Sequence, residues 1–328
     1  MIWSDGNDTG RGEELAGHGV IRKCGPIRIV KPLFSVVIPA YNDWAALDGC
    51  LRSLAQQEKA PSFEVLVVDD GSREPAPPLI HRWTGYFFLA IVRQPHQGVA
   101  SARNRGAEAS RGSVLVFVDA DCRLRKECLS ALHSTIANSP GHDCFQLHLV
   151  GDCSTLVGRA EGLRLMTLQN HLVQPDRRIR YLNTSGFAVR RTRVRPEEEM
   201  FDPSVRRGED TLFLARLMEQ GELPLFVREA IIEHTISLSL AKCLLKDVRS
   251  GYFAAKAHRE ISARGLRIRV NHLERLQVLS SMWRNSGEPS IGRAGYFVLL
   301  ARQSVERATS AVSKHLWRAP SASGHSTL

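Results

Sequence analysis

Two aspartates stand one residue apart at the end of an apolar run, and they are the strongest chemical signal in this chain. The run Val114–Asp121 reads V-L-V-F-V-D-A-D, and its β-branched residues predict a buried parallel strand. A buried carboxylate is costly unless cations or donors surround it. Ligands of open α/β sheets bind outside the carboxyl ends of strands. We therefore expect Asp119 and Asp121 to hold a divalent metal on a phosphate-bearing substrate; the alternative is a solvated acidic turn.

The elements before this pair favour the metal interpretation. Leu33–Pro39 predicts a second buried strand, followed by a helical pattern to about residue 57. Glu64–Val68 predicts a third strand, and Asp69 and Asp70 follow it directly. Phe87–Val92 predicts a fourth, leading into a small-residue helix that starts near residue 98. Strands alternating with helices predict a doubly wound α/β sheet with acids from two strands converging on one edge.

Four segments in this order resemble a known family. They read F-S-V-V-I-P-A-Y-N (34–42), V-L-V-V-D-D-G-S (65–72), G-V-A-S-A-R-N-R-G (98–106) and V-F-V-D-A-D (116–121). Together they resemble the nucleotide-sugar half of family 2 glycosyltransferases, which have the GT-A fold. Asn183-Thr184-Ser185-Gly186 resembles the glycine loop of that family, and Gly208-Glu209-Asp210 resembles its acidic catalytic motif. The resemblance covers residues 33 to about 236.

The resemblance implies a donor site and a metal site. Residues expected to contact the donor nucleotide or its sugar are Pro39, Ala40, Tyr41, Asp43, Asp70, Arg103, Asp119, Ser185 and Gly186. The expected metal ligands are Asp119, Asp121 and His234, holding Mn²⁺ or Mg²⁺, since hard oxygen donors suit both ions and Mn²⁺ also tolerates an imidazole. Glu233 is an alternative to His234.

Several roles at the donor site have competing interpretations. The Asp70 carboxylate is expected to accept from the edge of a base, with uracil favoured, while Tyr41 stacks on that base. Arg105 is the rival of Arg103 on the same helix. Asp43 also fits the N-cap of the first helix.

On the acceptor side, Asp210 is the expected general base, because a sugar hydroxyl is a poor nucleophile near neutral pH. Glu209 is the alternate base. An aspartate at a helix start is also a common cap, so a purely structural role competes. The resemblance implies an inverting displacement of the nucleoside diphosphate by the acceptor hydroxyl.

The basic excess of the chain is confined to its C-terminal part. Residues 238–328 carry 15 Lys and Arg against 5 Asp and Glu, whereas the remaining residues are balanced. Three helices are expected there, at Leu238–Ser262, His272–Trp283 and Arg293–Trp317. The last has an apolar stripe, with Arg302 and Arg307 off it. Two interpretations stay open: packing on the catalytic domain with solvated arginines, or an interfacial helix on an anionic inner leaflet.

The predicted organisation has four parts: a flexible leader (1–31), a GT-A catalytic domain (32–237), a basic helical extension (238–318) and a disordered tail (319–328). The catalytic domain divides into a nucleotide-binding half (32–122) and an acceptor half (123–237). Seven scattered cysteines predict free thiols in a reducing compartment. No apolar run approaches the ~20 residues of a membrane span.

These observations predict a hexosyltransferase that moves a single sugar from a nucleotide-diphosphate sugar to a glycan or lipid-linked acceptor, as in polysaccharide biosynthesis. The enzyme is expected in the cytoplasm, and one interpretation places it at the inner membrane face as a peripheral protein. A nucleotidyltransferase using the same acids is one alternative, and a non-catalytic sugar-nucleotide-binding or scaffold protein is another. No Gly-x-Gly-x-x-Gly follows the first strand, which disfavours an oxidoreductase. No nucleic-acid partner is expected, because the basic part contains no recognisable DNA-binding module.

Overall fold

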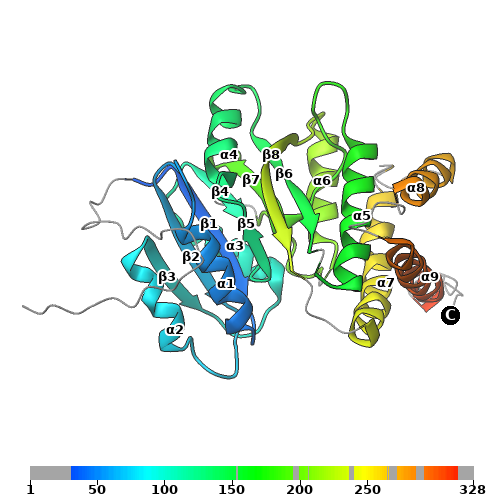
Figure 1. Ribbon diagram of the computed structural model, residues 1–328, viewed down its shortest axis with the longest axis horizontal. Coiled ribbons are helices and arrows are strands. Elements are labelled where there is room, and N and C mark those ends of the chain that lie inside the picture. Colours follow the sequence, from blue (N-terminus) through cyan, green and yellow to red (C-terminus); the bar gives the residue numbers. More distant parts are fainter. Residues whose placement is uncertain are drawn as a thin grey trace, which may run out of the picture.

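A computed structural model describes residues 31–152, 154–194, 199–205, 207–235, 240–263, 265, 272–285 and 292–316. A mixed sheet lies at the centre of the described part, with helices on both faces and three C-terminal helices beside it (Figure 1). The predicted leader and tail fall outside the described residues, apart from Lys31. No helix of the described ranges has the length and apolar content that crossing a bilayer requires.

The sheet has eight strands in the order β3-β2-β1-β4-β7-β6-β8-β5. They are β1 (Phe34–Ala40), β2 (Phe63–Asp69), β3 (Phe88–Arg93), β4 (Val114–Phe117), β5 (Cys122–Leu124), β6 (Cys144–Gly151), β7 (Phe187–Arg190) and β8 (Leu225–His234). The first four strands are parallel, and β7 pairs antiparallel with both β4 and β6. One sheet therefore runs through both predicted halves of the catalytic domain.

The helices are α1 (Trp44–Ala55), α2 (Pro78–His81), α3 (Val99–Ala109), α4 (Cys128–Ala137), α5 (Leu156–Leu172), α6 (Glu209–Glu219), α7 (Leu240–Ala263), α8 (His272–Asn285) and α9 (Gly292–Leu316). Strand alternation sends side chains to both faces. In β1, Val36 and Ile38 join the core formed with α1 and α4, whereas Val37 joins the core formed with α3 and α6. Cover on both faces explains why the strands read as continuous apolar runs.

The apolar run before Asp119 forms strand β4, as predicted, and the two acids follow it in a turn. Strand β4 ends at Phe117, and the Cys122 amide donates to the Asp119 carbonyl at 3.1 Å, which closes a turn. The chain then enters β5, which pairs antiparallel with β8 at the far edge of the sheet. This bend places the two acids between strands, where their side chains can face different neighbours.

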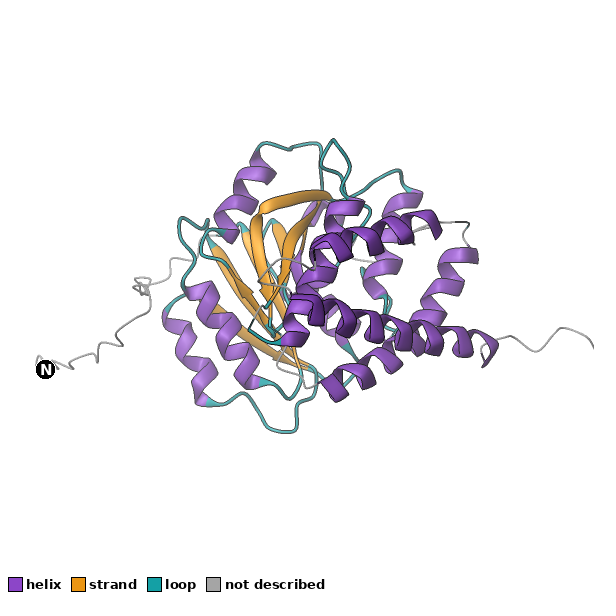
Figure 2. Ribbon diagram, turned by 45° about the vertical axis from the view of Figure 1, so that its right-hand side comes forward, coloured by secondary structure: helices purple, strands orange, loops and turns teal. Residues whose placement is uncertain are grey.

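The C-terminal extension packs on α5, but not through the predicted apolar stripe of α9. Leu299 on α9 joins Val278 and Met282 of α8 against the α5 side chains Ala160 and Leu163. The stripe residues Phe297 and Val312 are instead 59% and 61% exposed. Figure 2 shows α8 and α9 on the outside of the molecule, with the sheet behind them.

The expectation of solvated arginines on α9 is wrong for Arg302. Its guanidinium makes two hydrogen bonds to Asp247 of α7, at 2.7 and 3.0 Å, and lies 3.6 Å from Glu161 of α5. Two buried acids on different helices thus require a buried cation, so Arg302 ties α9 to the rest of the fold. Arg307 is exposed, as expected.

Candidate functional site

The loops after β1 and β2 are tied together at the carboxyl edge of the sheet. The Asn42 amide donates to Ser72 Oγ at 2.9 Å, and Asn42 Oδ1 accepts from the Arg73 amide at 2.8 Å. Asn42 itself is left-handed, with φ of 55°. This tie fixes the predicted segment from Pro39 to Tyr41 beside the Asp70 turn.

Asp43 is the N-cap of α1, because its carboxylate accepts from the Ala46 amide at 3.1 Å. The structural interpretation of this residue is therefore confirmed, and its ribose contact stays a prediction.

Asp70 is buried and organises the loop before α3. Its carboxylate accepts from Gln94 Nε2 at 2.8 Å and from the Gln97 and Gly98 amides, each at 2.9 Å. The His96 Nδ1 atom lies 2.9 Å from the remaining side of the same carboxylate. The His96 ring nitrogen also makes a hydrogen bond with the Asp70 backbone carbonyl at 3.1 Å. Three donors and this ring therefore crowd the carboxylate, and a base that binds Asp70, as predicted, must share or displace one of these contacts.

Tyr41 is stacked on His96, with ring centroids 4.3 Å apart and an interplanar angle of 23°. Both rings are about half exposed. The stack forms a flat aromatic surface beside Asp70, which is the kind of surface on which a nucleobase can lie.

Arg103 links the nucleotide half of the site to the acceptor half. Its side chain is 3% exposed, and it donates to Asp119 Oδ1 at 2.7 Å and to Glu209 Oε1 at 2.6 Å. Both terminal nitrogens of Arg103 thus donate to carboxylates, and its expected contact with the donor stays a prediction. Arg105 instead pairs with Glu108 on the surface.

Asp119 is held by two elements that lie far apart in the sequence. Besides Arg103, it accepts from Ser185 Oγ at 2.7 Å. Burial alone would raise the pKa of Asp119, but the Arg103 charge and the Ser185 hydrogen bond lower it overall. The carboxylate therefore stays charged at neutral pH, and both of its oxygens already have partners.

Ser185 is presented by a short 3-10 turn, Thr184–Gly186, just before β7. The turn begins at Asn183, whose side chain accepts from the Ser185 amide at 2.9 Å. Gln146 donates to the Gly186 carbonyl at 2.9 Å. A Cβ on Gly186 would lie 2.8 Å from a methyl group of Leu149, so the turn packs closely only with glycine here.

Asp210 lies in the first turn of α6, which begins after the left-handed Gly208 (φ 88°). Its carboxylate accepts from the Thr211 amide at 2.6 Å. Burial and the neighbouring Glu209 charge raise the pKa of Asp210 to about 7, against the lowering effect of Arg103 and Thr211. A carboxylate that exchanges its proton near neutral pH is suited to general-base chemistry.

The two acids of this turn have different surroundings. Glu209 is buried and its carboxylate is engaged in an ion pair with Arg103. Asp210 has no such cation at hydrogen-bond distance in the described part of the chain, apart from its longer-range attraction to Arg103. The geometry favours Asp210 over Glu209 as the proton acceptor.

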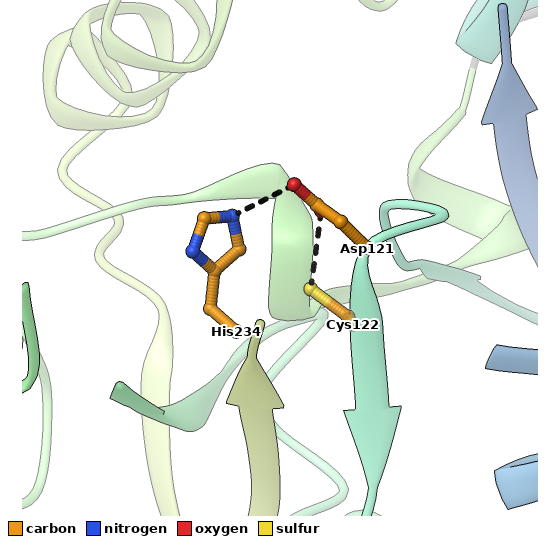
Figure 3. Close-up of side chains that lie close together, drawn as sticks. All are labelled: Asp121, Cys122 and His234. Atoms are coloured by element: carbon orange, nitrogen blue, oxygen red, sulfur yellow. Dashed lines mark hydrogen bonds and ion pairs between the residues drawn. The ribbon is translucent and has the colours of Figure 1, made fainter. Parts of the chain in front are cut away.

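Asp121, Cys122 and His234 come together where β5 pairs with β8 (Figure 3). His234 Nε2 lies 3.4 Å from Asp121 Oδ2, and Cys122 Sγ lies 3.9 Å from Asp121 Oδ1. Cys122 is the registered partner of His234 in the strand pair, which fixes this arrangement through backbone pairing.

The donor atoms of this cluster fit a hard divalent ion. His234 Nε2 faces the partly exposed Asp121 carboxylate, whereas Nδ1, on the other side of the ring, is buried with no hydrogen-bond partner among the described residues (Figure 3). Burial, strengthened by the nearby acids, raises the pKa of the Cys122 thiol, and a soft sulfur donor is in any case a poor match for a hard ion. Carboxylate plus imidazole suits Mn²⁺ better than Mg²⁺. Both oxygens of Asp119 already contact Arg103 and Ser185, and Asp119 is not part of this cluster. Its role as a metal ligand stays a prediction.

Sequence reasoning missed four contributors: His96, Gln94, Gln146 and Cys122. A Gln and a His just before the Gln97-Gly98 helix start gave a weak signal for the first two. Gln146 lies inside β6, and nothing in its local pattern points to the Ser185 turn. Cys122 directly follows the second aspartate, but its contact with His234 depends on strand pairing across more than 100 residues.

The amino-acid sequence of residues 35–195 matches the family model described as glycosyl transferase family 2, which confirms the resemblance. The chain is 37% identical over 111 residues to glycosyltransferase AglE of Haloferax volcanii, covering 33% of this chain and 36% of that protein. It is 44% identical over 91 residues to the validoxylamine A glucosyltransferase of Streptomyces hygroscopicus subsp. limoneus, covering 27% of this chain and 20% of that protein. The match thus spans little more than a third of these relatives at most.

Two solved structures share the fold over most of their length. The mannosyltransferase PcManGT from Pyrobaculum calidifontis, in complex with GDP-Man and Mn²⁺, has a TM-score of 0.59 at 15% identity, covering 88% of each chain. Residues 1–349 of TarS from S. aureus have a TM-score of 0.52 at 16% identity, covering 87% of this chain and 90% of that one. At this identity the likeness establishes the fold alone, and it confirms the predicted GT-A architecture.

Proposed function

Residues 35–195 of this chain belong to glycosyl transferase family 2, and we propose from that premise that the protein is an inverting, metal-dependent glycosyltransferase. It moves one sugar from a nucleotide-diphosphate sugar to a hydroxyl of a glycan or lipid-linked acceptor in the cytoplasm. The observation that carries the proposal is the chain of contacts from Ser185 through Asp119 and Arg103 to Glu209, next to Asp210. These contacts bring Asp119, the acid proposed to lie beside the donor, into one site with Asp210, the proposed general base.

The donor is expected to lie along the carboxyl edge of the sheet. The base rests near the Tyr41 and His96 rings, where Asp70 can accept from its edge once a loop donor shares that carboxylate or gives way. UDP-sugars are the favoured class, because the uracil ring offers an N–H to a carboxylate. Use of a UDP-sugar remains a proposal, and PcManGT, solved with GDP-Man, shows that the fold also accommodates a purine.

A divalent ion held by Asp121 and His234 would neutralise charge on the leaving diphosphate. Asp119, kept ionised by Arg103 and Ser185, orients the ribose or the hydration shell beside it. These groups bind the donor and need no proton transfer of their own.

Asp210 takes the proton from the acceptor hydroxyl as the oxygen attacks the anomeric carbon. The attack comes from the face opposite the diphosphate, so the configuration inverts. The C–O bond to the diphosphate breaks as the new one forms, and the nucleoside diphosphate leaves with the electron pair. A positioned base of this kind contributes about 10²–10⁴-fold in rate.

A screen of nucleotide sugars tests the proposal. UDP-, GDP-, dTDP- and CMP-sugars, and the free nucleoside triphosphates, are each offered with and without Mn²⁺, and product release and thermal stabilisation are recorded. We expect Mn²⁺-dependent stabilisation and slow hydrolysis with one or a few nucleotide-diphosphate sugars. Release of pyrophosphate from a triphosphate would instead indicate a nucleotidyltransferase. Binding of sugar nucleotides without turnover in any acceptor mixture would favour a binding protein.

A further inference from the structure

Large apolar side chains are exposed together on the outer side of α8 and α9. Leu276 and Trp283 on α8 are 53% and 48% exposed, and Phe297 and Val312 on α9 are 59% and 61% exposed. Leu276 and Trp283 are two helical turns apart, and Phe297 and Val312 follow the same helical stripe, so each pair shares a face. We call these four residues the outer face.

The two helices meet within the outer face at Trp283 and Phe297. The Trp283 ring contacts the Phe297 ring, with centroids 6.5 Å apart, and Tyr296 lies 5.3 Å from Trp283. The opposite sides of the same helices supply Val278, Met282 and Leu299 to the core against α5. Folding therefore already uses one side of each helix, and the outer face is apolar surface that the core does not need. A large exposed apolar patch of this kind marks an interaction site.

Charge identifies the partner. Residues 238–328 carry the whole net charge of +10, whereas the rest of the chain is neutral. Exposed arginines border the outer face, including Arg284 and Arg307. Arg293 stands 5.8 Å over the Trp283 ring. Tryptophan, tyrosine and arginine beside aliphatic residues form the composition with which helices lie in the headgroup region of anionic membranes.

We propose that the outer face of α8 and α9 seats this protein on an anionic lipid bilayer, with the helices in the plane of the headgroups. A second copy of the chain fits less well, because an isologous contact would bring two +10 segments together. A nucleic acid would match the charge but would leave the aliphatic side chains uncovered. This proposal goes beyond the transfer chemistry and does not depend on the donor.

Vesicle co-sedimentation of the full chain tests the proposal. Vesicles of neutral phosphatidylcholine are compared with vesicles containing 30% phosphatidylglycerol, at low and high salt. The wild type should bind the anionic vesicles, bind the neutral ones much more weakly, and be released as salt screens the arginines.

Two substitutions define the surface. The double variant Phe297→Glu with Val312→Glu places charges on the outer face and should weaken binding by about tenfold or more, the effect of losing roughly one buried apolar side chain. The matched control is Leu79→Glu, which changes a 42% exposed apolar residue on α2, at the opposite end of the sheet (Figure 1). The control should bind as the wild type does.

Three outcomes would overturn the proposal: no binding of the wild type to anionic vesicles at low salt, equal binding by the double variant, or a wild-type dimer that the double variant converts to a monomer. Donor binding, measured separately with a nucleoside diphosphate and Mn²⁺, should be the same in all three proteins. If donor binding is absent in the wild type while vesicle binding persists, the proposed function fails and the membrane surface stands.

Discussion

Replacing Glu209 by Gln removes one charge next to the proposed base while keeping the shape of the site. The Gln carbonyl oxygen can still accept the hydrogen bond that Arg103 Nη1 donates to Glu209, now at 2.6 Å. The negative charge that raises the pKa of Asp210 disappears, and the Arg103 charge is less compensated. Both effects lower the pKa of Asp210.

The size of the shift follows from Coulomb's law. Two unit charges about 6 Å apart interact by about 2.8 kcal/mol at an effective dielectric constant of 20, which is about two pKa units. Solvent at the partly exposed Asp210 screens some of this, so we expect a decrease of about one to two units. The base form of Asp210 is then populated at lower pH, and the acid limb of the activity profile moves down by the same amount.

The assay is kcat/KM for sugar transfer measured from pH 5 to pH 9. The wild type should reach half its maximal value near pH 7, the pKa of Asp210, and Glu209→Gln should reach it near pH 5 to 6. Glu108→Gln, a change at a surface ion pair with Arg105, is the control and should leave the midpoint in place. An unchanged or raised midpoint would refute the reasoning. A loss of about 100-fold or more at every pH would make Glu209 the base instead.

Three further changes test neighbouring parts of the site. The raised pKa of Asp210, about 7 against an ordinary 3.8, costs about 4 kcal/mol above pH 7 before solvent screening at this partly exposed side chain reduces it. Asp210→Asn should therefore exceed the wild type in free energy of unfolding by about 2–4 kcal/mol at pH 8. Urea titrations should show the gap closing from pH 7 toward pH 4, because the wild type loses stability as pH rises from about 4 through 7. Asp121→Ala should abolish Mn²⁺-linked binding of a nucleoside diphosphate in calorimetry, whereas Cys122→Ala should retain it; equal behaviour of the two would contradict the ligand assignment. Ser185→Ala removes a 2.7 Å hydrogen bond and should raise the donor KM by about five- to tenfold, roughly 1 kcal/mol, and an unchanged KM would show that Ser185 does not position Asp119.

Local patterns predicted the strands and the acids well, because each depends on neighbours in the sequence. The apolar runs that end just before Asp69 and just before Asp119 fall within a residue or two of β2 and β4. A helix opened by Asp210 was also readable from the glycine and two acids before an apolar pattern, and α6 begins one residue earlier, at Glu209. The resemblance to a family supplied the expected roles of these residues in donor binding, metal binding and catalysis.

What the sequence could not show depends on pairing between distant residues. Nothing local says that Arg103 would contact Asp119 and Glu209 together, since that requires α3, the β4 turn and α6 to meet. The stripe on α9 was correctly recognised, but amphipathic spacing does not say which side faces the protein. The buried acids Asp247 and Glu161 pair with Arg302, so the Arg302 side of α9 faces the protein and the apolar stripe faces solvent.

The most direct test of whether Asp210 is the base of a glycosyl transfer is the transfer rate of Asp210→Asn under single-turnover conditions. The donor dissociation constant of the same variant is measured beside it. The Asn side chain is nearly isosteric, and the donor contacts at Asp119 and Asp121 are untouched. We predict a donor affinity within about threefold of the wild type and a transfer rate lower by about 100-fold or more. Transfer at the wild-type rate, or a loss of donor affinity equal to the loss of rate, would contradict the role assigned to Asp210.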